Sequence, residues 1–246
     1  MKAPDAISWS VVLPLGRDCG DPRPLLDALE EQVAPLSGGR HGILAVDDDA
    51  PEDARAAAGA WGSAHRSLVL LRNPVPRGPG DAARHGILLA GGERILLAID
   101  PPAIPEGLVA RMEEHLDDRN DLIVASPRID WTRPLPPVQI RRELIARALG
   151  PVASLFVGRD APLGSCPLHL YRRQAAREIY QRIRIDGPAF EVEVLYLARR
   201  YRYPVLETPW IAAPVDRTDD PPDPRPLGRL RELMRIRYGR LRGDYG

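Results

Sequence analysis

Three consecutive aspartates, Asp47, Asp48 and Asp49, follow the apolar run 42–46. Such a run is typical of a strand covered on both faces of an open α/β sheet, and ligands of these sheets bind where the strands end at their carboxyl side. Adjacent carboxylates repel one another unless water, backbone amides or a ligand compensates, so the cluster is a candidate site. An alternative stays open, in which the acids form an Asx-rich turn that caps a helix beginning at Pro51.

A loop that combines a cation with two glycines, Arg77-Gly78-Pro79-Gly80, is the second candidate. The guanidinium of Arg77 could bind phosphate through two parallel hydrogen bonds, or it could be a solvated loop cation. The spacing also matches a dinucleotide-binding Gly-x-Gly-x-x-Ala. That fingerprint should follow the first strand directly, which this loop does not, so we set the dinucleotide interpretation aside.

Later in the chain, Phe190-Glu191-Val192-Glu193 places two glutamates near the start of a predicted helix. Residues two apart on a helix face different directions, so we expect one glutamate at most to point into a site and the other to be solvated. His169 lies in a short predicted strand. It is either a basic residue of the site or a histidine at a strand edge.

Hydrophobic periodicity predicts strands that alternate with helices over the first half of the chain. The predicted strands are Ser8 to Leu15, 43 to 47, Ser67 to Leu71, Arg94 to Ile99 and Leu122 to Ala125. The predicted helices are Leu25 to Val33, Glu52 to His65, 81 to 90 and Pro105 to Leu116. This alternation predicts an α/β fold, a doubly wound and mostly parallel sheet with helices on both faces.

The second half of the chain has a looser pattern. After a loop at 127 to 138, we predict helices at Gln139 to Leu149, Arg172 to Ile183 and Ala189 to Tyr201, and strands at Leu168 to Tyr171 and Val205 to Thr208. We expect one domain over 1–215, followed over 216–246 by a proline-rich linker and a basic C-terminal helix.

The C-terminal helix is predicted to be amphipathic. One side carries apolar residues at steps of three and four, namely Leu227, Leu230, Met234, Tyr238 and Leu241, and arginines occupy most of the remaining positions. Such a helix either packs on the domain with solvated arginines or lies on an anionic membrane surface.

Composition excludes several classes of protein. The 246 residues, 44% of them hydrophobic, suffice for a full core, and 34 basic residues balance 34 acidic ones, so no net field favours nucleic acid. Cys19 and Cys166 form neither a disulfide framework nor a zinc site by spacing. No apolar run spans a membrane, and the N-terminus does not match a signal peptide. We therefore expect a cytoplasmic protein, peripheral at the inner membrane face if the C-terminal helix binds lipid.

Four sequence elements, in order, carry a resemblance to a known family. They are Val46 to Asp53; Asn73, Arg77, Gly78, Gly80, Ala83 and Gly86; Ile99-Asp100; and Ala189 to Leu195. Over residues 8 to 210 the chain resembles the family 2 glycosyltransferases. It is most similar to the branch that moves mannose or glucose from a nucleotide sugar to polyprenyl (dolichyl) phosphate.

The resemblance implies a GT-A fold and a set of site residues. Asp48 would bind the base of the donor, and Asp100 would lie near its ribose, diphosphate and metal, which is Mg²⁺ or Mn²⁺ in the family. The other nucleotide-binding positions implied are Pro14, Asp18, Asp47, Arg77, Gly78 and Gly80, and the catalytic positions are Asp100, Glu191 and His169.

The sequence departs from the family pattern at several positions. The family's Asp-x-Asp, whose second aspartate holds the cation, is Asp100-Pro101-Pro102 here, so one metal ligand is lost. Pro-x-Tyr-Asn-Glu after the first strand is represented by 14–18 without its tyrosine, and Ser-Gly-Phe-(Lys/Arg) by 166–169. The alternative to a transferase is thus an inactive or regulatory binding protein of the same fold, and a third hypothesis is an unrelated nucleotide-binding enzyme.

Overall fold

The computed structural model describes residues 7–99, 101, 103–128, 166–211 and, near the C-terminus, 232, 234, 235, 238 and 242. Asp100 and Pro102 lie outside the described residues, as do the predicted helix at 139–149 and the expected domain boundary at 215.

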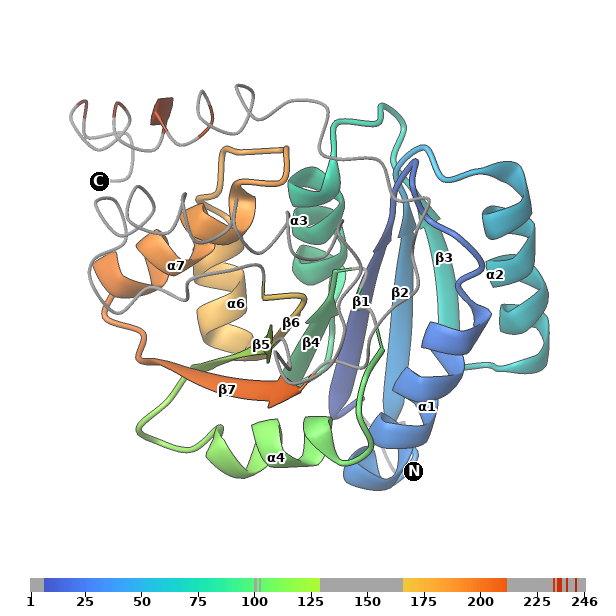
Figure 1. Cartoon of the computed structure of the whole chain (residues 1–246), viewed down its shortest axis with the longest axis horizontal. Helices are drawn as coiled ribbons and strands as arrows, with labels where there is room; N and C mark the ends of the chain where they lie inside the picture. The colour runs from blue at the N-terminus through green and yellow to red at the C-terminus, as the bar shows by residue number, and fades with distance from the viewer. Residues whose placement is uncertain are drawn as a thin grey trace, which may run out of the picture.

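Seven strands form one sheet in the order β3-β2-β1-β4-β6-β5-β7 (Figure 1). Their bounds are β1 Trp9–Leu15, β2 His41–Asp47, β3 Leu68–Arg72, β4 Arg94–Ala98, β5 Leu122–Arg128, β6 Leu168–Arg172 and β7 Val205–Ile211. All run in one direction except β6, which pairs antiparallel with both β4 and β5. The predicted doubly wound, mostly parallel sheet is confirmed.

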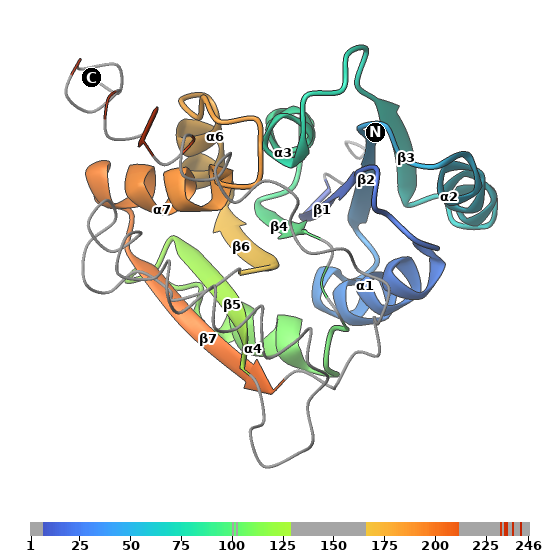
Figure 2. The ribbon, with the colours of Figure 1, turned by 45° about the horizontal axis from the view of Figure 1, so that its top comes forward.

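Helices cover both faces of this sheet (Figure 2). Helices α3 Pro79–Leu89, α6 Arg173–Tyr180 and α7 Phe190–Arg200 pack on one face, and α1 Arg23–Ser37, α2 Glu52–Ala64 and α4 Leu108–His115 pack on the other. Each face therefore has its own hydrophobic core. Strand β1 is buried along almost its whole length because both of its sides are covered, which explains its continuous apolar sequence.

Several predicted bounds differ from the structure at their ends. The helix predicted from Pro105 starts at Leu108, after Gly107 adopts a left-handed φ of 71°. The last strand was predicted to stop at Thr208 but continues to Ile211, because Pro209 pairs with Ser126 as part of a parallel ladder to β5. Among the described residues, no helix is long and apolar enough to cross a membrane.

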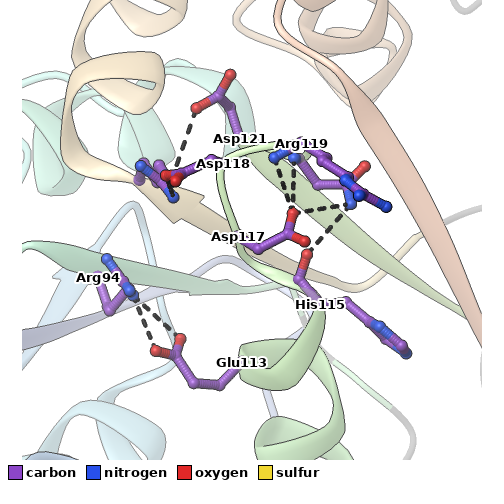
Figure 3. Close-up of polar contacts among 9 residues, drawn as sticks. Arg94, Glu113, His115, Asp117, Asp118, Arg119 and Asp121 are labelled. Atoms are coloured by element: carbon purple, nitrogen blue, oxygen red, sulfur yellow. Dashed lines mark hydrogen bonds and ion pairs between the residues drawn. The ribbon is translucent and has the colours of Figure 1, made fainter.

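The edge of the sheet opposite the carboxyl ends of β1 to β4 is held by ion pairs (Figure 3). Arg94 binds Glu113 of α4 with its Nε 3.0 Å from Oε1, and Arg172 at the end of β6 binds Asp118 at 2.8 Å. Asp117 accepts the backbone N–H of Arg119 at 2.9 Å, a bond that lowers the pKa of this carboxyl. Glu113 thus connects α4 to β4, and Asp117 and Asp118 hold the turn between α4 and β5. All three acids have structural roles.

Candidate functional site

The carboxyl ends of β1, β2 and β3 lie side by side, since Leu15 pairs with Asp47 and Asp47 pairs with Arg72. The three aspartates of the cluster leave this edge together. Each of them has different partners, which relieves their mutual repulsion.

Asp47 is buried and closes the turn that leads into α2, a helix without a side-chain cap. Its Oδ1 accepts the N–H of Ala50 at 2.9 Å, and its Oδ2 lies 3.2 Å from Nη1 of Arg55. The structural alternative from the sequence, an Asx turn before a helix, therefore describes this member of the cluster.

Asp48 is also buried, but it binds the loop after β3. Its Oδ1 accepts Nδ2 of Asn73 at 2.9 Å and the N–H of Arg77 at 3.2 Å, and its Oδ2 accepts the N–H of Gly78 at 2.7 Å. The N–H of Asp48 itself donates to the carbonyl of Leu15 at 2.8 Å. Through its backbone and its side chain, this one residue thus links the ends of β1 and β2 to the loop that follows β3.

Asp49 has a left-handed φ of 73° and points toward the loop after β1, where its carboxylate pairs with Arg17. Both side chains are largely solvent-accessible. Of the two other predicted positions on β1 and its loop, Pro14 pairs with Val46 in the ladder and Asp18 is exposed in the following turn.

Residues 77–81, here called the glycine loop, comprise the N-cap of α3, the residue before it and the first three residues of the helix. Gly78 has a φ of 127°, which favours glycine, and a Cβ there would lie 2.6 Å from the carbonyl oxygen of Asp186. The N–H of Gly80 donates to this same oxygen at 2.8 Å, and a Cβ on Gly80 would collide with the carbonyl of Ile185. Both glycines are thus needed because another backbone passes directly against the loop.

That second backbone, residues 184–189, is here called the support loop, and the sequence analysis did not identify it. The Asp186-Gly187 pair before a helix was its one local signal. The pKa of Asp186 is raised by desolvation and by the nearby charge of Asp81, while Arg84 and Arg77 oppose the shift. Acids and arginines therefore alternate around the glycine loop.

The two glutamates of α7 are both engaged, so the expectation that one is solvated is wrong. Glu193 is fully buried, and its Oε2 accepts the N–H groups of Arg184 at 3.0 Å and Ile185 at 2.9 Å. Oε2 of Glu191 accepts the N–H of Cys166 at 2.9 Å. Both carboxylates are turned back on the chain because other segments bring backbone donors to them: the segment just before α7 for Glu193, and the more distant segment before β6 for Glu191.

Glu191 lies next to the end of β4. The carbonyl of Pro167, which follows Cys166, accepts the N–H of Ile99 at 2.7 Å, and Ile99 directly precedes Asp100. The structure therefore brings the predicted Glu191 and the segment before Asp100 to the same edge of the sheet as Asp48.

His169 is neither a basic site residue nor a strand-edge histidine. It is fully buried in β6, between β4 and β5, and its Nδ1 lies 2.7 Å from the hydroxyl of Tyr171. Burial lowers the pKa of His169 to about 4, although the backbone of Cys166 opposes the shift. The imidazole is therefore neutral near pH 7. A second tyrosine, Tyr180, continues the chain of hydroxyl groups at 3.1 Å.

No group of three or more His, Cys, Asp or Glu side chains in the described ranges is arranged to hold a metal ion. Asp47, Asp48 and Asp49 already accept hydrogen bonds or pair with arginines. The thiol of Cys166 is buried and its pKa lies well above the usual value because of desolvation, so it is uncharged at neutral pH.

Comparison with known proteins gives relatives in sequence. No protein-family model matches the chain. The chain is 27% identical over 184 residues to a dolichyl-phosphate beta-glucosyltransferase of Dictyostelium discoideum, covering 72% of this chain and 56% of the relative. It is 25% identical over 190 residues to the protein of the same name in Drosophila melanogaster, covering 73% and 57%. The chain thus spans little more than half the length of these curated relatives.

Solved structures share the fold. A mannosyltransferase from Pyrobaculum calidifontis, in complex with GDP-Man and Mn²⁺, matches with a TM-score of 0.56 at 15% identity over 86% of this chain and 58% of that chain. Glucosyl-3-phosphoglycerate synthase from Mycobacterium tuberculosis matches with a TM-score of 0.58 at 18% identity, covering 93% and 76%. The chain is thus similar in sequence to dolichyl-phosphate beta-glucosyltransferases, and it shares its fold with these two solved proteins.

Proposed function

We propose that the chain transfers a hexose from a nucleotide sugar to polyprenyl phosphate or a similar phosphate acceptor. One observation carries this proposal: the sequence similarity to two dolichyl-phosphate beta-glucosyltransferases covers 72% and 73% of this chain. The arrangement of Asp48, the glycine loop and the end of β4 at one carboxyl edge supports it, because ligands of open α/β sheets bind there.

Asp48 is the proposed binding group for the base of the donor. A carboxylate has about four acceptor positions, and three of those on Asp48 are occupied by Asn73, Arg77 and Gly78. The remaining position can accept the imide N–H of uracil or guanine. Because its partners fix the carboxylate in place, the nucleotide would meet a preorganised acceptor. Asp47, Pro14 and Asp18 would contribute to the walls around it.

Transfer to a phosphate acceptor requires little general base, because the attacking oxygen is already anionic. The requirement falls on positioning and on positive charge near the departing diphosphate. Arg77, the exposed first residue of the glycine loop, is the proposed cation, since Arg17 is paired with Asp49. Glu191 is proposed to position the end of β4 near Asp100. His169 supports the interior of the sheet and does not contact the substrate.

A divalent metal would add charge at the diphosphate when bound. The described carboxylates do not fit a metal site as they stand. Two residues after Asp100, Pro102 stands in place of a second aspartate. We propose that metal dependence is therefore weak. Donor binding titrated with manganese, in the wild type and in Pro102→Asp, is the measurement; the variant should gain metal dependence. Tight and absolute dependence of the wild type on manganese would contradict this.

The function is tested by transfer and hydrolysis assays with a panel of nucleotide sugars and with polyprenyl phosphate as acceptor, each with and without manganese. Transfer of one hexose supports the proposal. Pro102 is the residue that favours the alternative, a regulatory binding protein of the same fold. Nucleotide binding without transfer or hydrolysis would establish this alternative, and no binding of any nucleotide would exclude both.

We further propose that an anionic membrane surface is a partner. Met234 and Tyr238, on the predicted apolar side of the C-terminal helix, are 54% and 56% exposed, and the neighbouring Arg235 and Arg242 are exposed as well. The guanidinium of Arg242 lies 4.3 Å from the ring centre of Tyr238. Exposed apolar and basic groups on one segment favour contact with lipid over packing against the domain.

A further inference from the structure

The glycine loop and the support loop are packed against each other and joined by a hydrogen bond. The carbonyl of Asp186 accepts the N–H of Gly80 at 2.8 Å, and no room exists for a side chain on Gly78 or Gly80 against the support loop. The glycine loop also donates two N–H groups to Asp48. A displacement of the support loop would therefore change the position of the segment that surrounds the proposed base-binding carboxylate.

The support loop is held at both of its ends by carboxylates. Glu193 accepts the N–H groups of Arg184 and Ile185 at its beginning. At its end, Oε2 of Glu232 accepts the N–H of Ala189 at 3.1 Å. Glu193 belongs to the adjoining helix α7, whereas Glu232 lies 43 residues after its partner Ala189. The second anchor is thus supplied by the C-terminal segment.

The geometry around Gly187 shows how closely Glu232 approaches. A Cβ placed on Gly187 would collide with the carboxylate of Glu232. The three atoms nearest to this Cβ all belong to that carboxylate. The carboxylate binds the N–H of Ala189, the N-cap residue of α7, where the helix dipole favours a negative charge.

We propose that Glu232 is a positioning residue of the nucleotide site. It holds the end of the support loop, which in turn holds the glycine loop around Asp48, so the C-terminal segment contributes to donor binding without contacting the donor. This inference rests on the proposed function. Without Glu232 the two loops would populate other arrangements. The apparent affinity for nucleotide would then fall in proportion to the fraction of molecules that keep the binding-competent arrangement.

The test compares Glu232→Ala and Glu232→Gln with the wild type in the full chain. We expect Glu232→Ala to raise the Kd for GDP or UDP and the KM for donor about three- to tenfold while kcat changes less than twofold. Glu232→Gln should stay near the wild type, because its amide oxygen still accepts the N–H of Ala189. Glu114→Ala, which removes an exposed glutamate from α4, is the matched control and should change neither constant.

Gly187→Ala provides a second, independent variant. Its methyl group would displace Glu232, so it should reproduce the effect of Glu232→Ala, and the double variant should be no worse than either single one. Additive effects, or unchanged affinity in Glu232→Ala, would overturn the inference.

Hydrogen exchange separates this inference from the proposed function. Exchange of the Gly80 amide should become faster in Glu232→Ala and in Gly187→Ala, whether or not a nucleotide binds. Unchanged exchange in both variants would refute the positioning role. If exchange increases but the wild type binds no nucleotide, the proposed function fails and the support of the glycine loop by Glu232 stands.

Discussion

Individual carboxylates of the candidate site differ in what they do, although the sequence presents them as equivalent neighbours. Asp47 closes the turn before α2, Asp48 holds the glycine loop and Asp49 pairs with Arg17. The partners of each side chain come from elements that are distant in sequence. The role of an acid in a cluster is therefore decided by the donors around it.

Asp48→Ala should weaken nucleotide binding about ten- to a hundredfold. The variant loses a charge-assisted hydrogen bond to the base, worth roughly 1.5 to 3 kcal/mol, and it releases the N–H of Gly78. Calorimetry with GDP and UDP is the measurement, and Asp53→Ala, which removes a nearby exposed acid, is the control. Unchanged affinity in Asp48→Ala would remove the base-binding role.

His169 should make the protein less stable in acid. Its pKa is about 4 when folded and about 6.5 when unfolded, so the unfolded state binds the proton first as the pH falls. The stability is fully present above pH 6.5 and declines toward pH 4, by about 3 kcal/mol at most at 1.36 kcal/mol per unit. Urea unfolding at several pH values measures this.

In His169→Asn this part of the pH dependence should disappear, because the asparagine does not titrate. The variant will be less stable at all pH values, so the comparison concerns the slope against pH and not the stability itself. His115→Asn, on the exposed end of α4, should keep the wild-type slope. Parallel profiles for the wild type and His169→Asn would show that another group carries the acid sensitivity.

Among the elements, α7 joins the two sides of the site. Its first turn carries Glu191, which holds the N-terminal end of β6, and Glu193, which holds the start of the support loop. These contacts cross between segments that no local pattern connects. The helix is thus a structural junction, and its position controls both the end of β4 and the glycine loop.

Glu193→Ala should destabilise the fold by about 2 to 5 kcal/mol. It leaves the buried N–H of Ile185 without its acceptor, at about 1 to 3 kcal/mol, and the loss of the part-buried bond to the N–H of Arg184 adds about 1 to 2 kcal/mol. Equilibrium unfolding in urea measures the change, with Glu31→Ala on the exposed side of α1 as control. A loss below 1 kcal/mol would mean that water replaces the carboxylate.

At the scale of the whole molecule, donor binding is proposed at the carboxyl edge of the sheet and membrane binding at the C-terminal segment. The nucleotide site is proposed at the carboxyl edge of the sheet, and the C-terminal segment presents Met234 and Tyr238 outward while Glu232 contacts the support loop. The C-terminal segment is thus proposed to have two roles. One side of it contacts a membrane, and the opposite side supports the donor site.

Truncation at Asp223 should abolish sedimentation with anionic liposomes. Each arginine near an anionic leaflet contributes on the order of 1 kcal/mol, and this attraction is screened as salt approaches the molar range. The full chain should bind anionic but not neutral vesicles at low salt. Glu232→Ala is the control that keeps the basic residues and should still bind. Equal binding by the truncated and full chains would mean that this helix only packs on the domain.

The order and type of the described elements were predictable from the sequence, because each depends on local periodicity. The apolar runs of β1 and β2 and the spacing in α1 each reflect burial within a few residues of chain. The glycine loop and the acidic cluster could also be identified, since glycines and adjacent acids are conspicuous in any sequence. Their grouping at one edge follows from the parallel direction of the strands.

Only the tertiary structure decided how those residues are paired. The antiparallel insertion of β6 between β4 and β5, the burial of His169, and the contact of Glu232 with the support loop all depend on segments far apart in sequence. Periodicity reports which side of an element is buried and not what lies against it. The partner of a polar group is therefore fixed only when the chain folds and brings the distant donor to it.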